Sequence, residues 1–187
     1  APLVLRGDDW VLDLSAIEAA FKDGVKVYML CSPQNPVGRV HTAKELTAVA
    51  ELADKYGVTV ISDEIHAPLS WVPFTPYLAL GKAAQRTGVT ITSSSKAWNV
   101  AGLKAAFLLT QGSEIQARLK GMPDAMHWRT SLVGAFAMES AFSHSVDWLD
   151  EVVEQIQDNL SFFQHEISKE LPKAKLFNME STYLVWV

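Results

Sequence analysis

The chain has 187 residues, 49% of them hydrophobic, and a formal net charge of -5. This composition is typical of a soluble globular protein with one substantial core, and it does not indicate disorder. A negative net charge without any block rich in Lys and Arg argues against nucleic acid or an anionic membrane as the partner. Small molecules are the expected ligands.

Cys31 is the single cysteine, so the chain by itself can build neither a disulfide framework nor a four-cysteine metal site. The histidines show no metal-ligand spacing, and we expect no metal site. No apolar run reaches the roughly 20 residues of a membrane-spanning helix, and the first ten residues lack the basic and apolar parts of a signal peptide. These features favour a cytoplasmic protein.

Short apolar runs alternate with helical patterns along the first part of the chain, as in βαβ units with a mostly parallel sheet. Ser15 and Glu18 have the spacing of a capping box and predict a first helix that ends near Lys22. The first strand is expected over residues 25–33.

A second capping box, Thr42 with Glu45, predicts a crossover helix that Gly57 ends. The helix leads into residues 58–63, an apolar run without strict alternation that is typical of a strand buried on both faces. Four residues form the apolar face of this helix: Leu46, Val49, Ala53 and Tyr56.

After a short helix over residues 75–88, two more strands are expected over residues 89–94 and 104–110. The remainder of the chain has mainly helical patterns. Three helices are predicted, over residues 114–121, 131–143 and 147–171.

Pro172 ends the last helix, and residues 174–187 have the pattern of two strands around a turn. We therefore expect a large α/β domain over residues 1–172 and the beginning of a smaller domain over residues 173–187. The run "TYLVWV" breaks off at Val187 without a polar segment after it, and the start also looks cut, so we expect a piece of a longer protein.

Three polar residues stand at the carboxyl ends of predicted strands: Asn35 after the first, Asp63 at the end of the second and Lys96 after the third. In open α/β sheets, ligands bind outside the carboxyl ends of the strands. The three residues are therefore expected to converge on one edge of the sheet.

Asp63 and Asn35 each have a purely structural interpretation. A carboxylate after an apolar strand requires a cationic or hydrogen-bonding partner, such as a protonated heterocyclic nitrogen, but Asp63 could equally cap a helix or turn. Asn35 and Pro36 are ordinary turn residues, although Pro36 also favours an extended Asn35 that could direct its amide toward a ligand.

Lys96 follows a run of serines whose hydroxyl and backbone N–H groups could bind an anion such as phosphate. Lys104 adds a positive charge eight residues later. A desolvated lysine close to another cation has a lowered pKa and can act as a nucleophilic amine. A surface role for Lys96 is less suitable because apolar runs flank it on both sides.

Three motifs occur in order along the chain: "SPQNPVGR" (32–39), "VISDEIH" (60–66) and "TSSSKAWNVAGLK" (92–104). Together they resemble the aspartate-aminotransferase superfamily of pyridoxal-phosphate (PLP) enzymes of fold type I, and the similarity covers nearly the whole chain. The details "DEIHAPL" and "SSSKAWNVAGLK" are most similar to the MalY/PatB branch of cystathionine β-lyases.

The resemblance implies a fold type I large domain without its N-terminal part, with a mostly parallel sheet and helices on both faces, followed by the start of a small α+β domain. It implies that Lys96 binds PLP covalently, that Asp63 pairs with the pyridinium nitrogen and that Asn35 contacts the phenolic oxygen. The phosphate would be held by Ser93, Ser95 and Lys104.

At two positions the residue type differs from that of many aminotransferases. His66 stands where they have tyrosine, which makes it a possible second partner of the phenolic oxygen. Lys104 stands where they have arginine, which keeps the charge but loses the bidentate grip. Both departures suit the β-lyase branch better.

The resemblance implies a carbon–sulfur β-lyase that converts cystathionine or a cysteine S-conjugate to a thiol, pyruvate and ammonia. The alternative is a class I/II aminotransferase with the same residues. An amino-acid substrate and a homodimer are implied in either case.

Two further alternatives stay open. Ser93 and Lys96 match the S-x-x-K motif of Ser-Lys hydrolases, although the companion motifs S-D-N and K-T-G are absent. The chain as given could also be inactive, because the family's ring-stacking aromatic residue and glycine-rich phosphate loop lie upstream and its substrate-binding arginine lies downstream.

Overall fold

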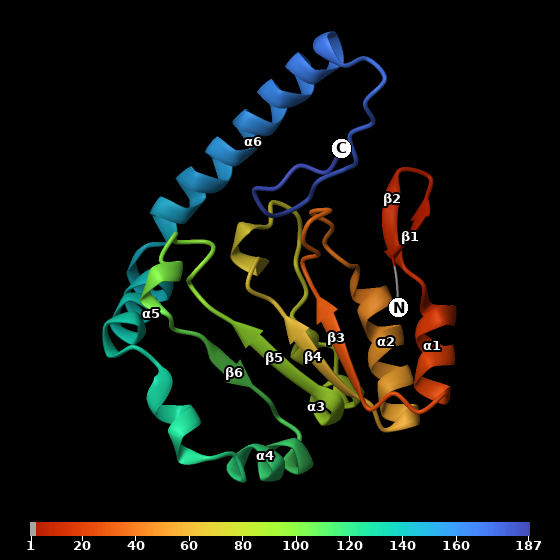
Figure 1. The fold of residues 1–187 in the computed structure, drawn as a ribbon, viewed down its shortest axis with the longest axis vertical. Coiled ribbons are helices and arrows are strands. Elements are labelled where there is room, and N and C mark those ends of the chain that lie inside the picture. The colour runs from red at the N-terminus through yellow and green to blue at the C-terminus, as the bar shows by residue number, and fades with distance from the viewer. Residues whose placement is uncertain (1–2) are drawn as a thin grey trace.

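A computed structural model of the protein describes residues 3–187, without the side chain of His127. A four-stranded sheet lies at its centre, with strand order β3-β4-β5-β6 (Figure 1). β3, β4 and β5 are parallel and β6 is antiparallel to β5, so the predicted α/β fold with a mostly parallel sheet is confirmed. The strands are β3 (Val27–Cys31), β4 (Thr59–Asp63), β5 (Gly88–Thr92) and β6 (Phe107–Leu109).

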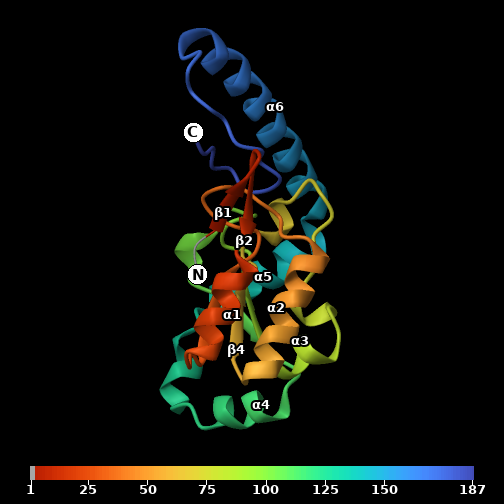
Figure 2. The same ribbon diagram turned by 90° about the vertical axis from the view of Figure 1, so that its right-hand side faces the viewer.

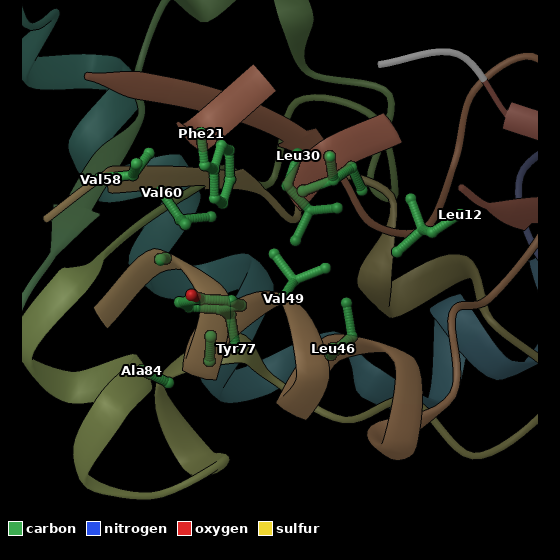
Figure 3. Close-up of a cluster of buried hydrophobic side chains, with 12 residues drawn as sticks. Leu12, Phe21, Leu30, Leu46, Val49, Val58, Val60, Tyr77 and Ala84 are labelled. Atoms are coloured by element: carbon green, nitrogen blue, oxygen red, sulfur yellow. The ribbon is translucent and has the colours of Figure 1, made fainter. Parts of the chain in front are cut away.

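One face of the sheet packs against α1 (Leu14–Lys22), α2 (Ala43–Tyr56) and α3 (Lys82–Thr87). Figure 3 shows the apolar side chains that interdigitate between the strands and these helices, with Tyr77 among them. Alternate residues point to the other face, where Val27 and Met29 of β3 are 51% and 65% exposed. The helices around this core therefore cover one face of the sheet within residues 3–187.

The helix signals of α2 are confirmed. Glu45 N donates to Thr42 Oγ1 at 3.2 Å and Thr42 N donates to Glu45 Oε2 at 2.8 Å, which is the predicted capping box. Gly57 ends the helix in the left-handed region with φ +65°.

The capping box predicted for the first helix is wrong. Asp13 is the N-cap of α1, and its Oδ1 accepts a hydrogen bond from Ala16 N at 3.0 Å. The carboxylate of Glu18 instead accepts from Lys55 Nζ and Tyr56 OH of α2, each at 2.9 Å. The tertiary contact between the two helices, together with a good cap two residues earlier, thus replaces the local motif.

A β-hairpin precedes α1 and was not among the predicted elements. β1 (Leu3–Arg6) pairs antiparallel with β2 (Asp9–Leu12) around a turn in which Gly7 has φ +65°. Leu12 is 6% exposed and belongs to the core, so the hairpin packs against the α/β body.

Three helices follow the sheet, as predicted: α4 (Ser113–Lys120), α5 (Leu132–His144) and α6 (Val146–Glu170). α5 and α6 pack on the turns beyond the strands through a second apolar cluster. In the described part of the chain no helix has both the length and the hydrophobicity of a membrane span. Short 3-10 helices complete the fold: η1 (Ala67–Leu69), η2 (Tyr77–Ala79), η3 (Ala101–Leu103) and η4 (Asp124–Arg129).

The two strands predicted over residues 174–187 are wrong, because the described tail contains no strand. After α6 the chain runs back across the carboxyl ends of β3 and β4, as both Figure 1 and Figure 2 show. Its backbone bonds to loops of the α/β body: Glu180 N donates to Gly38 O at 2.8 Å, and Trp71 N donates to Glu180 O at 3.2 Å. The predicted domain boundary after residue 172 stays a prediction.

Candidate active site

The strand register brings the predicted site residues to one edge of the sheet. Cys31 is paired with Asp63 and Asp63 with Ile91, so the carboxyl ends of β3, β4 and β5 are level. The segments that carry Asn35, His66 and Lys96 all begin at this edge, above the strands in Figure 1. A ligand at this edge would meet side chains from three connections of the fold.

Asn35 and His66 form a direct pair, although 31 positions separate them in the sequence. Asn35 Nδ2 lies 3.3 Å from His66 Nε2. Since an amide nitrogen can only donate, Nε2 is the acceptor and the ring proton of a neutral His66 is on Nδ1. His66 is 3% exposed, and Nδ1 has no hydrogen-bond partner within residues 3–187, so this edge holds a buried donor without an acceptor.

The surroundings of His66, above all its burial, favour the neutral form of the ring. Burial, and next the positive charge of Lys96, lower the pKa of His66, while the negative charge of Asp63 acts in the opposite direction. The two charges thus lie close enough to act on the ring. The structure brings Asn35, Asp63, His66 and Lys96 together.

Asp63 also caps a turn, which is one of the structural roles that the sequence indicated. Its Oδ1 accepts a hydrogen bond from Ile65 N at 3.1 Å, which closes the turn after β4. The side chain is half-buried. A carboxylate has two oxygens and about four acceptor positions, so this bond leaves capacity for a ligand.

Glu64 is a buried carboxylate that the sequence analysis did not single out. Its Oε1 accepts from Ser62 Oγ at 2.9 Å, Tyr77 N at 2.9 Å and Thr90 Oγ1 at 3.2 Å. Burial raises the pKa of Glu64, and the neighbouring charge of Asp63 adds to this effect. Glu64 therefore ties the end of β4 to β5. Its position directly after a strand is the feature of the sequence that could have pointed to it.

The serine run forms a compact hydrogen-bonded turn. Ser93 Oγ donates to Ala105 O at 2.6 Å and accepts from Ser95 N at 3.0 Å. Ser95 Oγ lies 2.6 Å from Ser93 Oγ, and since Ser93 has already used its proton, Ser95 is the donor. The hydroxyl of Ser93 is thus fully engaged within the protein.

Lys104 lies beside this turn. Its backbone has φ +56°, in the left-handed region, and its side chain is exposed. The bond between Ser93 Oγ and Ala105 O holds the next residue against the serines. The structure therefore brings Lys104 to the same turn as Ser93 and Ser95, with its ammonium open to solvent.

The comparisons with known proteins show the family of the chain. The model of the family "Aminotransferase class I and II" matches residues 4–187, and the chain belongs to this family. A Mycobacterium leprae protein, provisionally named a cystathionine beta-lyase, is 40% identical over 197 residues, which cover 100% of this chain and 48% of that protein. Cystathionine beta-lyase PatB of Bacillus subtilis is 34% identical, and the match covers 100% of this chain and 49% of PatB.

The structure of cystalysin from Treponema denticola, which contains a pyridoxal 5'-phosphate cofactor, superposes with a TM-score of 0.87. Its sequence identity is 26%, over 98% of this chain and 48% of cystalysin. The expected fold type I architecture is thereby confirmed. The chain spans about half the length of the curated relatives it matches.

Proposed function

We propose that the complete gene product that contains this chain is a PLP-dependent carbon–sulfur β-lyase. It would convert cystathionine or a related cysteine S-conjugate to a thiol, pyruvate and ammonia. The observation that carries the proposal is the Asn35–His66 pair at the same sheet edge as Asp63 and Lys96. The names of the similar Mycobacterium leprae and Bacillus subtilis proteins support the choice of reaction.

The side chains at this edge fit the chemical groups of PLP. The carboxylate of Asp63 suits a protonated ring nitrogen, and the buried Nδ1–H of His66 provides a donor for an anionic oxygen. Asn35 would be a second donor there. Lys96 would hold the cofactor covalently through its amine, as the resemblance of the motif at residues 92–104 to the family implies.

The phosphate would lie on the serine turn. Lys104 is its most available partner, because its side chain is exposed, whereas Ser93 and Ser95 would have to give up their bonds to Ala105 O and Ser93 Oγ before they could donate to a phosphate oxygen. Ser93 would otherwise hold the turn in shape. When bound, PLP supplies an electron sink that makes the substrate's Cα proton acidic.

Lys96, Asp63 and His66 would each have a separate role in the proposed reaction. The amine Nζ of Lys96 would accept the proton from Cα of the substrate as general base. Asp63 would lie beside the ring nitrogen and pair with it. His66 would keep its proton on Nδ1, since both its burial and the charge of Lys96 oppose a second proton on the ring.

Aminotransfer is the second candidate, because the matching family is named for that reaction. It would use the same residues, so geometry does not separate the two. The Ser-Lys hydrolase alternative is disfavoured, since Ser93 is 1% exposed and donates its proton to a backbone carbonyl rather than to Lys96.

The experiment is an assay of the complete gene product, supplied with PLP, on cystathionine. Equal amounts of pyruvate and thiol are expected, and Lys96→Ala should abolish both. Lys120→Ala, at an exposed position at the end of α4, is the matched control and should keep the activity. Amino transfer that depends on a keto acid and releases no thiol would refute the lyase proposal.

We also propose a location, a substrate class and an oligomeric state for the complete protein. The complete protein would act in the cytoplasm on a small amino-acid substrate, as a homodimer, without nucleic-acid or membrane partners. The dimer follows from the family resemblance. Light scattering that gives a monomer mass for the active enzyme would contradict it.

A further inference from the structure

We propose that Glu180 is a positioning residue that fastens the strap, residues 177–183, between the two loops that carry Asn35 and His66. The proposal rests on the proposed function in one respect, namely that these two side chains bind the cofactor. Figure 1 shows the strap crossing the sheet edge at the carboxyl ends of β3 and β4.

Glu180 bonds to both loops at once. Its N–H donates to Gly38 O at 2.8 Å, and its carboxylate oxygen Oε2 accepts from Val40 N at 2.8 Å. On the other side, Trp71 N donates to Glu180 O at 3.2 Å. One residue therefore joins the loop after β3 to the turn after β4, although 140 positions separate Val40 and Glu180 in the sequence.

The next residue of the strap reaches His66 itself. Ser181 Oγ donates to the backbone carbonyl of His66 at 3.3 Å and accepts from Ser70 Oγ at 3.1 Å. Ser181 and its neighbour Thr182 are both 0% exposed. The ring of Tyr183 meets the His66 ring edge-on, with 6.0 Å between centroids. The strap thus covers the backbone and one side of His66.

The loop after β3 is shaped for the strap. Gly38 has φ +70°, and a Cβ at this position would come within 2.7 Å of Met179 Cγ and 3.0 Å of Ser181 O. A glycine is therefore required here both for its backbone conformation and for the close approach of the strap.

Backbone hydrogen bonds within this loop connect Gly38 to the residue before Asn35. Gly38 N donates to Gln34 O at 2.8 Å, and Gln34 N donates to Arg39 O at 2.8 Å. Asn35 directly follows Gln34. A strap fastened to Gly38 and Val40 thus limits the movement of the backbone that aims the Asn35 amide at His66.

The backbone of the strap is itself strained at one point. Thr182 has φ +74°, in a region that β-branched residues rarely adopt. Such a conformation persists only where the surroundings impose it, and such positions cluster at functional sites. Here Thr182 Oγ1 accepts from Leu184 N at 3.2 Å, and the residue is enclosed.

The test compares three variants of the complete gene product: Glu180→Ala, Glu180→Gln and, as a control, Glu154→Ala at an exposed position of α6. The first readout is the tautomer of His66, from the nitrogen NMR shifts of its ring without PLP. The second is the dissociation constant for PLP. A residue that only stabilised the tail would move neither readout.

Glu180→Ala should weaken PLP binding about three- to tenfold, since it removes a hydrogen bond of ordinary strength, and should reduce the population of His66 with its proton on Nδ1. Glu180→Gln keeps an acceptor for Val40 N and should restore both readouts, and Glu154→Ala should match the parent protein. A Glu180→Ala protein that equals the parent in both readouts would overturn the proposal.

If Glu180→Ala does not fold, Glu180→Asp replaces it, because its shorter side chain keeps the charge but withdraws the carboxylate from Val40 N. A parent-like His66 tautomer and PLP affinity in Glu180→Asp would then overturn the proposal. Failure of the proposed function is a separate result, since it would appear as no PLP binding by the parent protein, while the tautomer measurement would still test the strap.

Discussion

Asn35 Nδ2 donates to His66 Nε2 across 3.3 Å, which joins the loop after β3 to the turn after β4. The bond fixes the tautomer of a buried ring and leaves its Nδ1–H unpaired at the sheet edge within residues 3–187. A neutral donor held in place in this way suits the recognition of an anionic oxygen.

Asn35→Ala should weaken PLP binding by the complete gene product about tenfold. The substitution removes one donor to the ligand directly, and it also frees the His66 ring to take either tautomer. Fluorescence titration with PLP measures the change. The control is Asn159→Ala on α6, which should bind like the parent. Equal affinities of the parent and Asn35→Ala would contradict the assignment.

Lys104 should act on the phosphate and not on the ring. Lys104→Met is expected to lower the affinity for PLP about tenfold and to change the affinity for pyridoxal, which has no phosphate, very little. The ratio of the two dissociation constants is the measured quantity. Asn35→Ala should lower both affinities alike, so a similar ratio in the two variants would show that Lys104 does not contact the phosphate.

His41 should make the protein less stable in acid. Burial is the main cause that lowers the pKa of His41 to about 4, with the charge of Glu45 opposing and that of Arg39 assisting. The unfolded chain takes up this proton near its ordinary pKa of 6.5, so the free energy of unfolding falls as the pH drops between these two values. The complete loss from this residue would be about 3 kcal/mol.

Urea unfolding of the parent and of His41→Leu at pH 7 and pH 4.5 measures this contribution. The variant should lose less stability over the interval, by about 2–3 kcal/mol. Glu64 acts in the opposite direction, because its raised pKa means that protonation favours the folded state as the pH falls. An equal pH dependence in the parent and in His41→Leu would refute the assignment to His41.

The N-cap of α1 gives a prediction about stability alone. Asp13→Ala should lower the free energy of unfolding by about 1 kcal/mol, because Ala16 N loses its acceptor. Ser15→Ala should change it very little, since Ser15 lies within α1 and is not its cap. Urea unfolding measures both. A larger loss from Ser15→Ala than from Asp13→Ala would restore the capping box that the sequence suggested.

Sequence motifs predicted the structure correctly where they act only on neighbouring residues. Thr42, Glu45 and Gly57 act on neighbouring backbone, so their spacing alone predicted the ends of α2. Ser15 and Glu18 have the same spacing, but they form no capping box, because Glu18 binds Lys55, a residue 37 positions away. Local motifs predict structure until a tertiary partner competes for them.

The candidate site shows the same limit. Strand ends could be located from the sequence, and the parallel order of β3, β4 and β5 then brought Asn35, Asp63 and Lys96 to one edge. The bond between Asn35 and His66 could not be predicted, since it depends on how two turns meet. The strap was also missed, because strong strand propensity in "TYLVWV" was overridden by the hydrogen bonds of Glu180 to distant loops.

Lys96 is the lysine that we propose holds PLP. Borohydride reduction of the PLP-loaded complete gene product fixes the cofactor on its lysine, and peptide mass spectrometry then locates it. We expect one cofactor per chain, on Lys96, and none on Lys104 or in a Lys96→Ala protein. Labelling of another lysine, or no labelling of a protein that has bound PLP, would contradict it.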